Sequence, residues 1–396
     1  MMRSVAEAHD LILSAIEPVD TETVALADAM GRVLREPVLA DRPAPPFDRV
    51  MMDGYAVLRA CWEGGQETFT VEGAARAGTA KRTLSSPKNA IEVSTGAVLP
   101  RGCDVVVPVE SCERDGNRVT FNEPVSAYPA GRFIHRLGSD HTTGDVVLDS
   151  GLVLGPAELA VAATEGVTSL VVSRALSVGL ISTGDEVVTP ETLPMDHQIR
   201  ASHPVALSSL VRAGRAVTWQ HTHAGDTAEA LRAAIGELLP AVDVLLLTGG
   251  VSMGRWDLVP DALAACGVEA VFHRVAQRPG KPLWFGRKGA QSVFALPGNP
   301  QSALCCARRY VCGALDAYAG SSSSGGYPVV LEDSVKPLST FSRFVPVRLV
   351  SGKLRVVSSS NSGHVQGLAG SCGMIECPLG EEEIPPGTPL PFYPWS

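Results

Sequence analysis

Between residues 175 and 320 the chain alternates short apolar strands with helical segments. The expected strands are Val178–Ser182, Val217–Gln220, Val242–Leu247, Val271–Val275 and Ser292–Leu296. Val242–Leu247 is apolar at every position except Asp243, which is typical of a strand buried on both faces of a parallel sheet. Alternation of strands and helices at this spacing predicts a three-layer α/β domain.

Helices are expected between these strands, at Pro204–Ala213, Ala228–Leu239, Leu258–Ala265 and from Pro300 to about Tyr318. Two of the helix starts carry local signals. Asp226 and Glu229 form a variant capping box. Asn299 is expected to cap the last helix, with Pro300 at the favoured first position.

The sequence texture differs outside this region. Ser4 and Glu7 form a capping box for a first helix, and second and third helices are expected at Ala25–Leu34 and Pro156–Gly166. Short β-branched runs at Thr68–Val71, Ile91–Val93, Val105–Val107 and Val119–Phe121 alternate with Gly, Pro and Asn. The expected domains are a linking helical and β segment (1–40 and 141–174), a β-rich insert (41–140), the α/β domain (175–320) and, after a Gly/Ser linker, a small C-terminal β domain (327–396).

Composition excludes several classes of protein. The 396 residues exceed what one hydrophobic core organises. With 33 Lys and Arg against 42 Asp and Glu, the net charge of -9 argues against a nucleic-acid partner. No apolar run reaches the roughly 18–20 residues of a membrane span, and the N-terminal segment lacks the pattern of a signal peptide. The nine Cys show no CxxC pair, so we expect reduced thiols and a cytoplasmic protein.

A polar loop follows the first strand of the α/β domain, with the sequence STGDE at 182–186. A turn at the carboxyl end of a parallel strand is where α/β sheets bind ligands. Asp185 and Glu186 can hold Mg²⁺ or accept hydrogen bonds from a ligand there. The alternative is a plain turn with solvated acids.

A Gly-rich loop follows the buried strand, at Leu247–Asp257. Its glycines let the backbone approach an anion closely, and its amides and the Ser252 hydroxyl can receive phosphate oxygens. The loop lacks the GxxxxGK[ST] pattern of a P-loop. A simple turn, with Asp257 as a helix cap, is the alternative.

Two further loops suit an anion. Arg278 and Lys281 lie beside Gly280 in an RPGKP turn, with Arg274 four residues earlier, and such cations bind phosphate or another oxyanion. The turn at Leu296–Ser302 enters a helix N-terminus, which also favours anions. A solvated basic turn and a plain Asn299 cap are the respective alternatives.

The insert has polar turns of its own. Phe47–Ala56 places two acids and an arginine beside Gly54, and Thr95–Ala97 and Gly138–Asp140 are other polar turns. Read singly, each fits a hairpin turn. The His residues show no zinc-ligand spacing, and the His221-x-His223 pair fits a strand edge better than a metal site.

Six of these stretches occur in one order along the chain. They are FDxxxMDGYA at 47–56, TGAxLPxGxDxVVxxE at 95–110, STGDE at 182–186, TGGVSxGxxD at 248–257, RPGKP at 278–282 and LPGNPxS at 296–302. Together they resemble the molybdopterin molybdenumtransferase family, which includes the MoeA and gephyrin E-domain enzymes.

The resemblance implies the last step of molybdenum cofactor synthesis. In that step adenylated molybdopterin and molybdate react, the dithiolene takes the metal and AMP leaves, with Mg²⁺ as the assisting cation. It also implies a homodimer whose active site lies between the α/β domain of one subunit and the insert of the other. The molybdopterin adenylyltransferase that acts upstream is a further implied partner.

The resemblance also implies roles for individual residues. Those with catalytic roles are Asp53, Thr95, Asp140, Glu186, Asp226 and Asp257, of which Glu186 and Asp257 are the expected Mg²⁺ ligands. Those that bind substrate are Thr183, Gly184, Asp185, Gly249, Gly250, Ser252, Gly254, Arg274, Arg278, Lys281, Pro297, Asn299, Arg348 and Ser362.

The chain departs from the family pattern at a few positions. Arg49-Val50 stands where many members have Asn-Ser, Ala201-Ser202-His203 stands where many have Asp-Ser-Asn, and Arg274 and Arg278 replace lysines of some members. A non-catalytic molybdopterin-binding or scaffold protein on the same fold is one alternative, but the full set of acids favours the enzyme. A competence-damage-type pyrophosphatase is another, and the insert and C-terminal domain argue against it.

Overall fold

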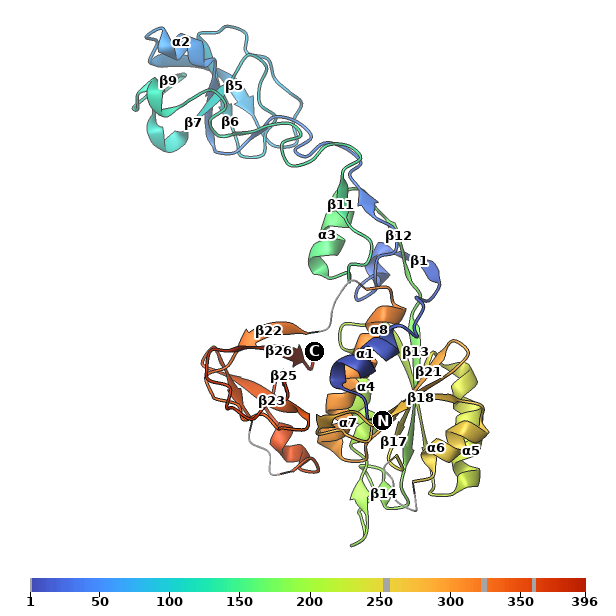
Figure 1. Ribbon diagram of the computed structural model, residues 1–396. Helices are drawn as coiled ribbons and strands as arrows, with labels where there is room; N and C mark the ends of the chain where they lie inside the picture. Colours follow the sequence, from blue (N-terminus) through green and yellow to red (C-terminus); the bar gives the residue numbers. More distant parts are fainter. Residues whose placement is uncertain (1, 252–256, 322–325, 358–360) are drawn as a thin grey trace. The chain divides into compact units, whose positions relative to one another are not determined.

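The computed structural model describes residues 2–251, 257–321, 326–357 and 361–396 (Figure 1). The chain forms two compact units, each with its own sheets and hydrophobic cores. The larger unit holds Met1–Glu36, Asp149–Ala160 and Thr168–Ser396, and the smaller holds Pro37–Leu148 and Val161–Val167. The segment expected to link the domains is therefore shared between the two units.

The smaller unit is built on a six-stranded sheet in the order β7-β4-β6-β5-β9-β8. Its strands are β4 Gly54–Val57, β5 Thr68–Ala75, β6 Asn89–Val93, β7 Val105–Pro108, β8 Cys112–Asp115 and β9 Arg118–Phe121. Neighbours are antiparallel except β5 and β6. The four β-branched runs of the insert are thus all strands, as predicted.

Alternate strand residues of this sheet fill one core on each face. Ala56 lies in one core, and its neighbours Tyr55 and Val57 lie in the other. A helix not expected from the sequence, α2 Arg59–Glu63, adds Trp62 to the second core. Five residues are too few to show a helical period. Beside the sheet, β3 Arg49–Val50 pairs antiparallel with β10 Ile134–His135.

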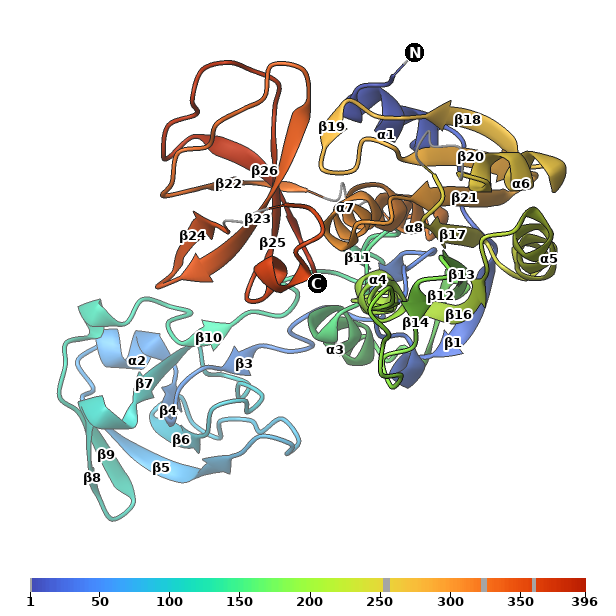
Figure 2. The same ribbon diagram turned by 90° about the horizontal axis from the view of Figure 1, so that it is seen from below.

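The larger unit contains the α/β sheet, in the order β16-β13-β17-β21-β20-β18 (Figure 2). Its strands are β13 Leu176–Thr183, β16 Val217–Ala224, β17 Val244–Thr248, β18 Glu269–His273, β20 Trp284–Lys288 and β21 Gln291–Leu296. The first four in sheet order are parallel, and β20 is antiparallel to both of its neighbours. The sequence predicts no strand at Trp284–Lys288, between the expected strands Val271–Val275 and Ser292–Leu296, so β20 is an addition and the sheet is mixed.

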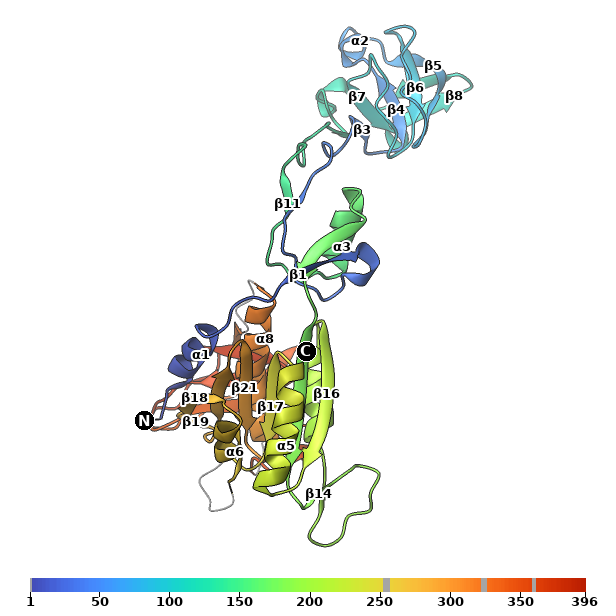
Figure 3. The same ribbon diagram turned by 90° about the vertical axis from the view of Figure 1, so that its right-hand side faces the viewer.

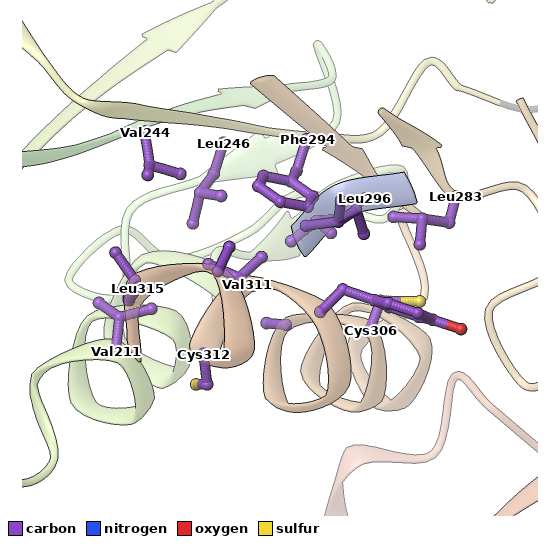
Figure 4. Close-up of a cluster of buried hydrophobic side chains, with 14 of the residues drawn as sticks. Val211, Val244, Leu246, Leu283, Phe294, Leu296, Cys306, Val311, Cys312 and Leu315 are labelled. Atoms are coloured by element: carbon purple, nitrogen blue, oxygen red, sulfur yellow. The ribbon is translucent and has the colours of Figure 1, made fainter. Parts of the chain in front are cut away.

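Helices cover both faces of this sheet, which confirms the three-layer prediction (Figure 2). On one face are α1 Val5–Leu13, α4 His203–Arg212, α7 Pro300–Cys306 and α8 Cys312–Tyr318, and on the other are α5 Ala228–Leu238 and α6 Val259–Ala265. Val244 and Leu246 pack with the first group, whereas Leu245 and Leu247 pack with the second. Figure 4 shows Val244, Leu246 and the β21 residues facing the helices. An unbroken apolar run is therefore what this strand requires.

One expected helix is wrong. Within Ala25–Leu34 only Leu26–Asp28 is helical, as a single 3₁₀ turn that follows the strand β1 Thr21–Ala25. The turn ends at Ala29, Gly31 follows with φ of +73°, and Val33 and Leu34 form β-bridges with Val153 and Val172. Pairing with distant strand segments thus overrides the local helical pattern.

The C-terminal residues form a third six-stranded sheet with the core order β19-β23-β25-β26-β22, and β24 pairs with β23. Its strands are β19 Gln277–Arg278, β22 Tyr327–Val330, β23 Ser342–Val350, β24 Lys353–Val356, β25 Gly373–Cys377 and β26 Pro389–Pro394. The first of them, β19, belongs to the RPGKP turn of the α/β domain. It pairs parallel with β23, with Arg278 opposite Arg343. The sheet therefore joins the RPGKP turn to the C-terminal domain.

No helix in the described part of the chain is both long and apolar enough to cross a membrane.

Candidate functional site

Four parallel strands of the α/β sheet end at one edge. The register places Thr183 of β13 opposite Ala224 of β16, and Ser182 opposite Thr248 of β17, which is itself opposite Leu296 of β21. The loops that follow these strands are the STGDE loop, the turn at Asp226, the Gly-rich loop and the PGNP turn. The sequence analysis assigned site residues to all four, and the fold brings them to the same edge.

The first and third loops are in contact. The buried Thr183 hydroxyl donates to the carbonyl of Thr248 at 3.0 Å. Gly249, with φ of +92°, lies directly over Thr183, because a Cβ there would be 2.6 Å from the threonine Oγ1. Only glycine fits this close approach. Thr183 and Gly249 are thus packed tightly against each other at the carboxyl end of the strands, and Gly250 is the next residue of the loop.

Asp185 and Asp226 tie the first loop to the second. The backbone N–H of each residue donates to the carboxylate of the other, both at 3.1 Å. Each carboxylate uses one of its oxygens in this way. The predicted capping box is wrong, since Thr227 caps α5 by accepting from the N–H of Ala230. The Asp226 carboxylate faces Asp185 instead.

Glu186 is exposed, and its carboxylate lies over Gly184. A Cβ on Gly184, which has φ of +121°, would be 2.6 Å from the glutamate Oε2. Because residue 184 is glycine, the Glu186 carboxylate can occupy the space that a side chain at 184 would fill. The three acids of these two loops, Asp185, Glu186 and Asp226, are all exposed.

The Gly-rich loop is described only in part. Ser252 and Gly254 lie outside the described residues. Asp257 is half-buried, and Val259, the first residue of α6, donates its N–H to the carbonyl of Gly250 at 3.3 Å. Leu258, rather than Asp257, takes the N-cap position of α6. The plain-cap alternative for Asp257 is therefore wrong.

An open pocket of about 740 Å³ lies between the RPGKP turn, the start of α7 and the C-terminal sheet. Four cationic side chains line it: Arg278, Lys281, Lys336 and Arg343. No acid is among its lining residues within the described chain, and none of the four cations forms an ion pair there. In a protein with a net charge of -9, this concentration of unpaired positive charge suits an anionic ligand.

The RPGKP turn is fixed from below by a buried polar group. Gln277 is fully buried, and its Nε2 donates to the carbonyl of Gly280 at 3.1 Å. A Cβ on Gly280, with φ of +95°, would be 2.5 Å from Cys306 Sγ and 2.7 Å from Gln277 Nε2. Gly280 is thus required by packing beneath the turn. Contact with Cys306 and Gln277 is thus sufficient to require glycine at this position, whether or not an anion approaches the other side of the turn.

The PGNP turn connects the pocket to the sheet edge. Pro297 and Asn299 line the pocket, and a Cβ on Gly298 would be 3.6 Å from the Cα of Gly249. Asn299 occupies the N-cap position of α7 without a side-chain bond to the helix. Its Nδ2 donates to Ser362 Oγ at 3.0 Å instead. The predicted helix start, with Asn299 at the N-cap and Pro300 after it, is therefore confirmed, but the Asn299 side chain contacts Ser362 instead of capping the helix.

Two expected substrate-binding arginines lie elsewhere. Arg274, with φ of +80°, precedes the RPGKP turn and is not among the residues that line the pocket. Arg348 is exposed on β23 and is also absent from the lining, whereas Arg343 of the same strand is present. Because strand side chains alternate between faces, two arginines five residues apart point to opposite sides. The alternation along β23 is a sequence signal that distinguishes Arg343 from Arg348, whereas Lys336 joins the pocket only through the fold.

The smaller unit holds the remaining three site residues. Oδ1 of Asp53 accepts from the N–H of Thr95 at 2.6 Å and from its hydroxyl at 3.0 Å. Both hydrogen bonds lower the pKa of Asp53 below its usual value, and the bond from the backbone N–H has the larger effect. Oδ1 of Asp140 is 2.7 Å from Nε2 of His135. Asp53 and Thr95 are thus a pair, and Asp140 has a partner that the sequence analysis did not name.

Comparison with known proteins adds an independent observation. A curated molybdopterin molybdenumtransferase of Synechocystis is 33% identical over 401 aligned residues, which cover 100% of both chains. The chain belongs to the molybdopterin molybdenumtransferase family. A second member, from Synechococcus elongatus, is 34% identical and covers 98% of this chain and 99% of its own. The family takes part in molybdenum cofactor biosynthesis, so this chain is a transferase of that pathway.

The molybdenumtransferase family is also recognised part by part. Its N-terminal region (domain I and II) matches residues 3–166, a probable molybdopterin binding domain matches residues 179–317, and its C-terminal region (domain IV) matches residues 328–395. A solved molybdopterin biosynthesis moeA protein of Pyrococcus horikoshii is similar over the full length of both chains, with 26% identity and a TM-score of 0.82. The family match thus extends over all of the regions that carry the site residues.

Proposed function

We propose that the chain inserts molybdate into adenylated molybdopterin and releases AMP. The observation that carries this proposal is the pocket of about 740 Å³ lined by four cations and, within the described chain, no acid. Molybdate is a dianion, and charge-assisted hydrogen bonds from Arg and Lys are the interactions that hold oxyanions. Membership of the family supplies the identity of the anion.

The pocket adjoins the turn that follows β21 at the carboxylate-bearing edge of the α/β sheet. Pro297 and Asn299 belong to both, because their turn follows β21 and also lines the pocket. An anion held by Arg278, Lys281 and Arg343 is therefore close to a ligand seated over Gly249. This arrangement supports two neighbouring subsites, one for molybdate and one for the adenylated pterin.

The residues present also fit a requirement for Mg²⁺. Within the described chain no group of three or more His, Cys, Asp or Glu side chains is arranged as a metal site. Mg²⁺ does not need such a cage, since it is usually held by one or two carboxylates together with substrate phosphates. We propose that Glu186 and Asp257 hold it. When bound, Mg²⁺ supplies positive charge beside the phosphates, which the exposed acids of this edge would otherwise repel.

The other edge residues orient the substrate. Thr183, Gly249 and Gly250 present a tight backbone surface to the pterin or its phosphate. Asp185 and Asp226 lock their two loops together and each presents one carboxylate oxygen. We assign them to substrate orientation, because a ligand N–H or hydroxyl can donate to that oxygen.

A titration with molybdate tests the pocket. Lys281→Ala or Arg343→Ala should weaken binding by roughly 10- to 150-fold, because a hydrogen bond to a charged group contributes about 1.5–3 kcal/mol. Lys353→Ala is the matched control. Lys353 is an exposed cation of the C-terminal sheet that pairs with Glu332 and does not line the pocket. Isotherms of the pocket variants that overlay the control would remove the pocket from the proposal.

We further propose a homodimer. Leu193, Met195 and Ile199, in the loop around β14 Val187–Val188 and β15 Ile199–Arg200 (Figure 3), are 84%, 66% and 58% exposed. Exposed apolar side chains grouped on one loop favour burial against another protein surface. Sedimentation should report about twice the 41.5 kDa chain mass. A monomer at micromolar concentration would contradict the dimer and leave the pocket proposal standing.

A further inference from the structure

A chain of three polar side chains crosses from β3 to β10 in the smaller unit. Arg49 and His135 are direct neighbours in this two-stranded ladder. Nη2 of Arg49 is 2.9 Å from Nδ1 of His135, and Nε2 of His135 is 2.7 Å from Oδ1 of Asp140. The imidazole therefore lies between a cation and a carboxylate, with one ring nitrogen engaged by each.

The chemistry of the two ends fixes the proton on the ring. A guanidinium only donates hydrogen bonds and does not lose its proton in proteins. Nδ1 of His135 must then accept, so it carries no proton. The remaining ring proton is on Nε2, which donates to Asp140. Arg49 and Asp140 thus favour the same neutral tautomer, whose N–H points at the carboxylate.

This arrangement occupies one oxygen of Asp140 and leaves the other available. Oδ1 accepts from His135, and the Ser139 hydroxyl is 3.4 Å from the same atom. Within the described residues Oδ2 makes no hydrogen bond or ion pair, and the side chain is 50% exposed. A direct arginine contact would instead engage both oxygens in a bidentate pair. Interposing a neutral imidazole keeps one oxygen charged and open.

We propose that Arg49 and His135 are positioning residues, which hold Asp140 so that its Oδ2 accepts a hydrogen bond from an N–H group of the pterin. The proposal rests on the proposed function for the identity of the ligand. It assigns the insert a part in recognising the heterocycle, through a carboxylate whose direction is set by two residues that do not touch the ligand themselves. Neither Arg49 nor His135 was among the residues expected in the site.

The tautomer is measured directly by ¹⁵N NMR of the imidazole in the full-length wild-type protein, in mildly alkaline buffer. The proposal requires a pyridine-type resonance for Nδ1 and a pyrrole-type resonance for Nε2 of His135. Arg49→Met should weaken this preference, because only the Asp140 carboxylate then favours a proton on Nε2. A wild-type ring protonated on Nδ1 would overturn the proposal, and this readout needs neither substrate nor turnover.

Kinetics with adenylated molybdopterin separate positioning from simple structural support. Glutamine places an amide N–H close to the position of Nε2, whereas asparagine places its amide near Nδ1. His135→Asn should therefore raise KM by about tenfold, the loss of one hydrogen bond to a charged group. His135→Gln should stay within about threefold of wild type, and kcat should change little in both.

Arg136→Met is the control, since Arg136 is the residue after His135 and pairs with Asp48 rather than Asp140. It should leave KM unchanged. Equal KM values for the Asn and Gln variants would overturn the positioning role. If the wild type releases no AMP at all, the proposed function fails, whereas the tautomer measurement still decides whether Arg49 and His135 direct Asp140.

Discussion

Replacing Gly280 with alanine tests how the anion pocket is built. The new Cβ would be 2.5 Å from Cys306 Sγ and 2.7 Å from Gln277 Nε2, in a residue with φ of +95°. A side chain in a left-handed conformation costs about 1–2 kcal/mol, and overpacking a buried site costs about 1–3 kcal/mol. The variant should lose about 2–5 kcal/mol of unfolding free energy, a large share of the roughly 5–15 kcal/mol typical of a protein.

Gly289→Ala separates the two contributions. Gly289 has φ of +58° and lies in the same α/β domain, but its nearest contact would be an ordinary 3.8 Å to Gln291. It should lose only the backbone part, about 1–2 kcal/mol. Urea unfolding of the two variants, followed by tryptophan fluorescence, measures the difference. Equal losses would refute the packing account of Gly280.

The same variant distinguishes packing from anion access. The Cβ would point toward Cys306 and Gln277, beneath the turn. Folded Gly280→Ala protein should therefore bind molybdate within about tenfold of wild type, a smaller loss than deletion of a charged hydrogen bond produces. A folded variant with no measurable affinity would show that glycine is needed on the pocket side.

Three further outcomes are expected. Burial lowers the pKa of His203 to about 4, so the folded state favours the neutral ring. The free energy of unfolding should therefore fall by up to about 3 kcal/mol as pH drops from about 6.5 toward 4. In His203→Gln the urea midpoint should depend less on pH over that range, and an unchanged pH dependence would contradict this. Glu186→Gln should abolish AMP release with an unaltered circular dichroism spectrum, and a normal rate would remove Glu186 from the metal site. Thr95→Val removes one of the two bonds that lower the pKa of Asp53, so an NMR titration should show that pKa rising; Thr142→Val near Asp145 should leave Asp53 unaffected.

Much of the α/β domain could be predicted from the sequence because its strands are buried on both faces. Val244–Thr248 has no exposed residue, so its apolar run is unbroken and easily read. β20 lacks such a run, because its buried Trp284 and Phe285 are followed by Gly286, Arg287 and the exposed Lys288. Glycine and charge together indicate a turn, whereas pairing with β21 makes this segment a strand.

Candidate site residues could be proposed from the sequence where a motif is local, but not where the residues meet only in the fold. The four loops at the sheet edge each follow a strand, so their meeting follows from the parallel topology. Arg343 reaches the pocket through its pairing with Arg278 across β19 and β23, which no local pattern shows. His135 likewise meets Arg49 only because β3 and β10 pair.

The central claim is that the cationic pocket delivers molybdate to adenylated molybdopterin. Its most direct test is AMP release by the purified protein with adenylated molybdopterin and Mg²⁺, measured as a function of molybdate concentration in wild type and Lys281→Ala. We predict no AMP without molybdate, one AMP for each molybdenum bound to the pterin, and a half-saturating molybdate concentration at least roughly tenfold higher in the variant. Tight binding of the pterin with no molybdate-dependent AMP release would contradict the account and indicate a binding or scaffold protein instead.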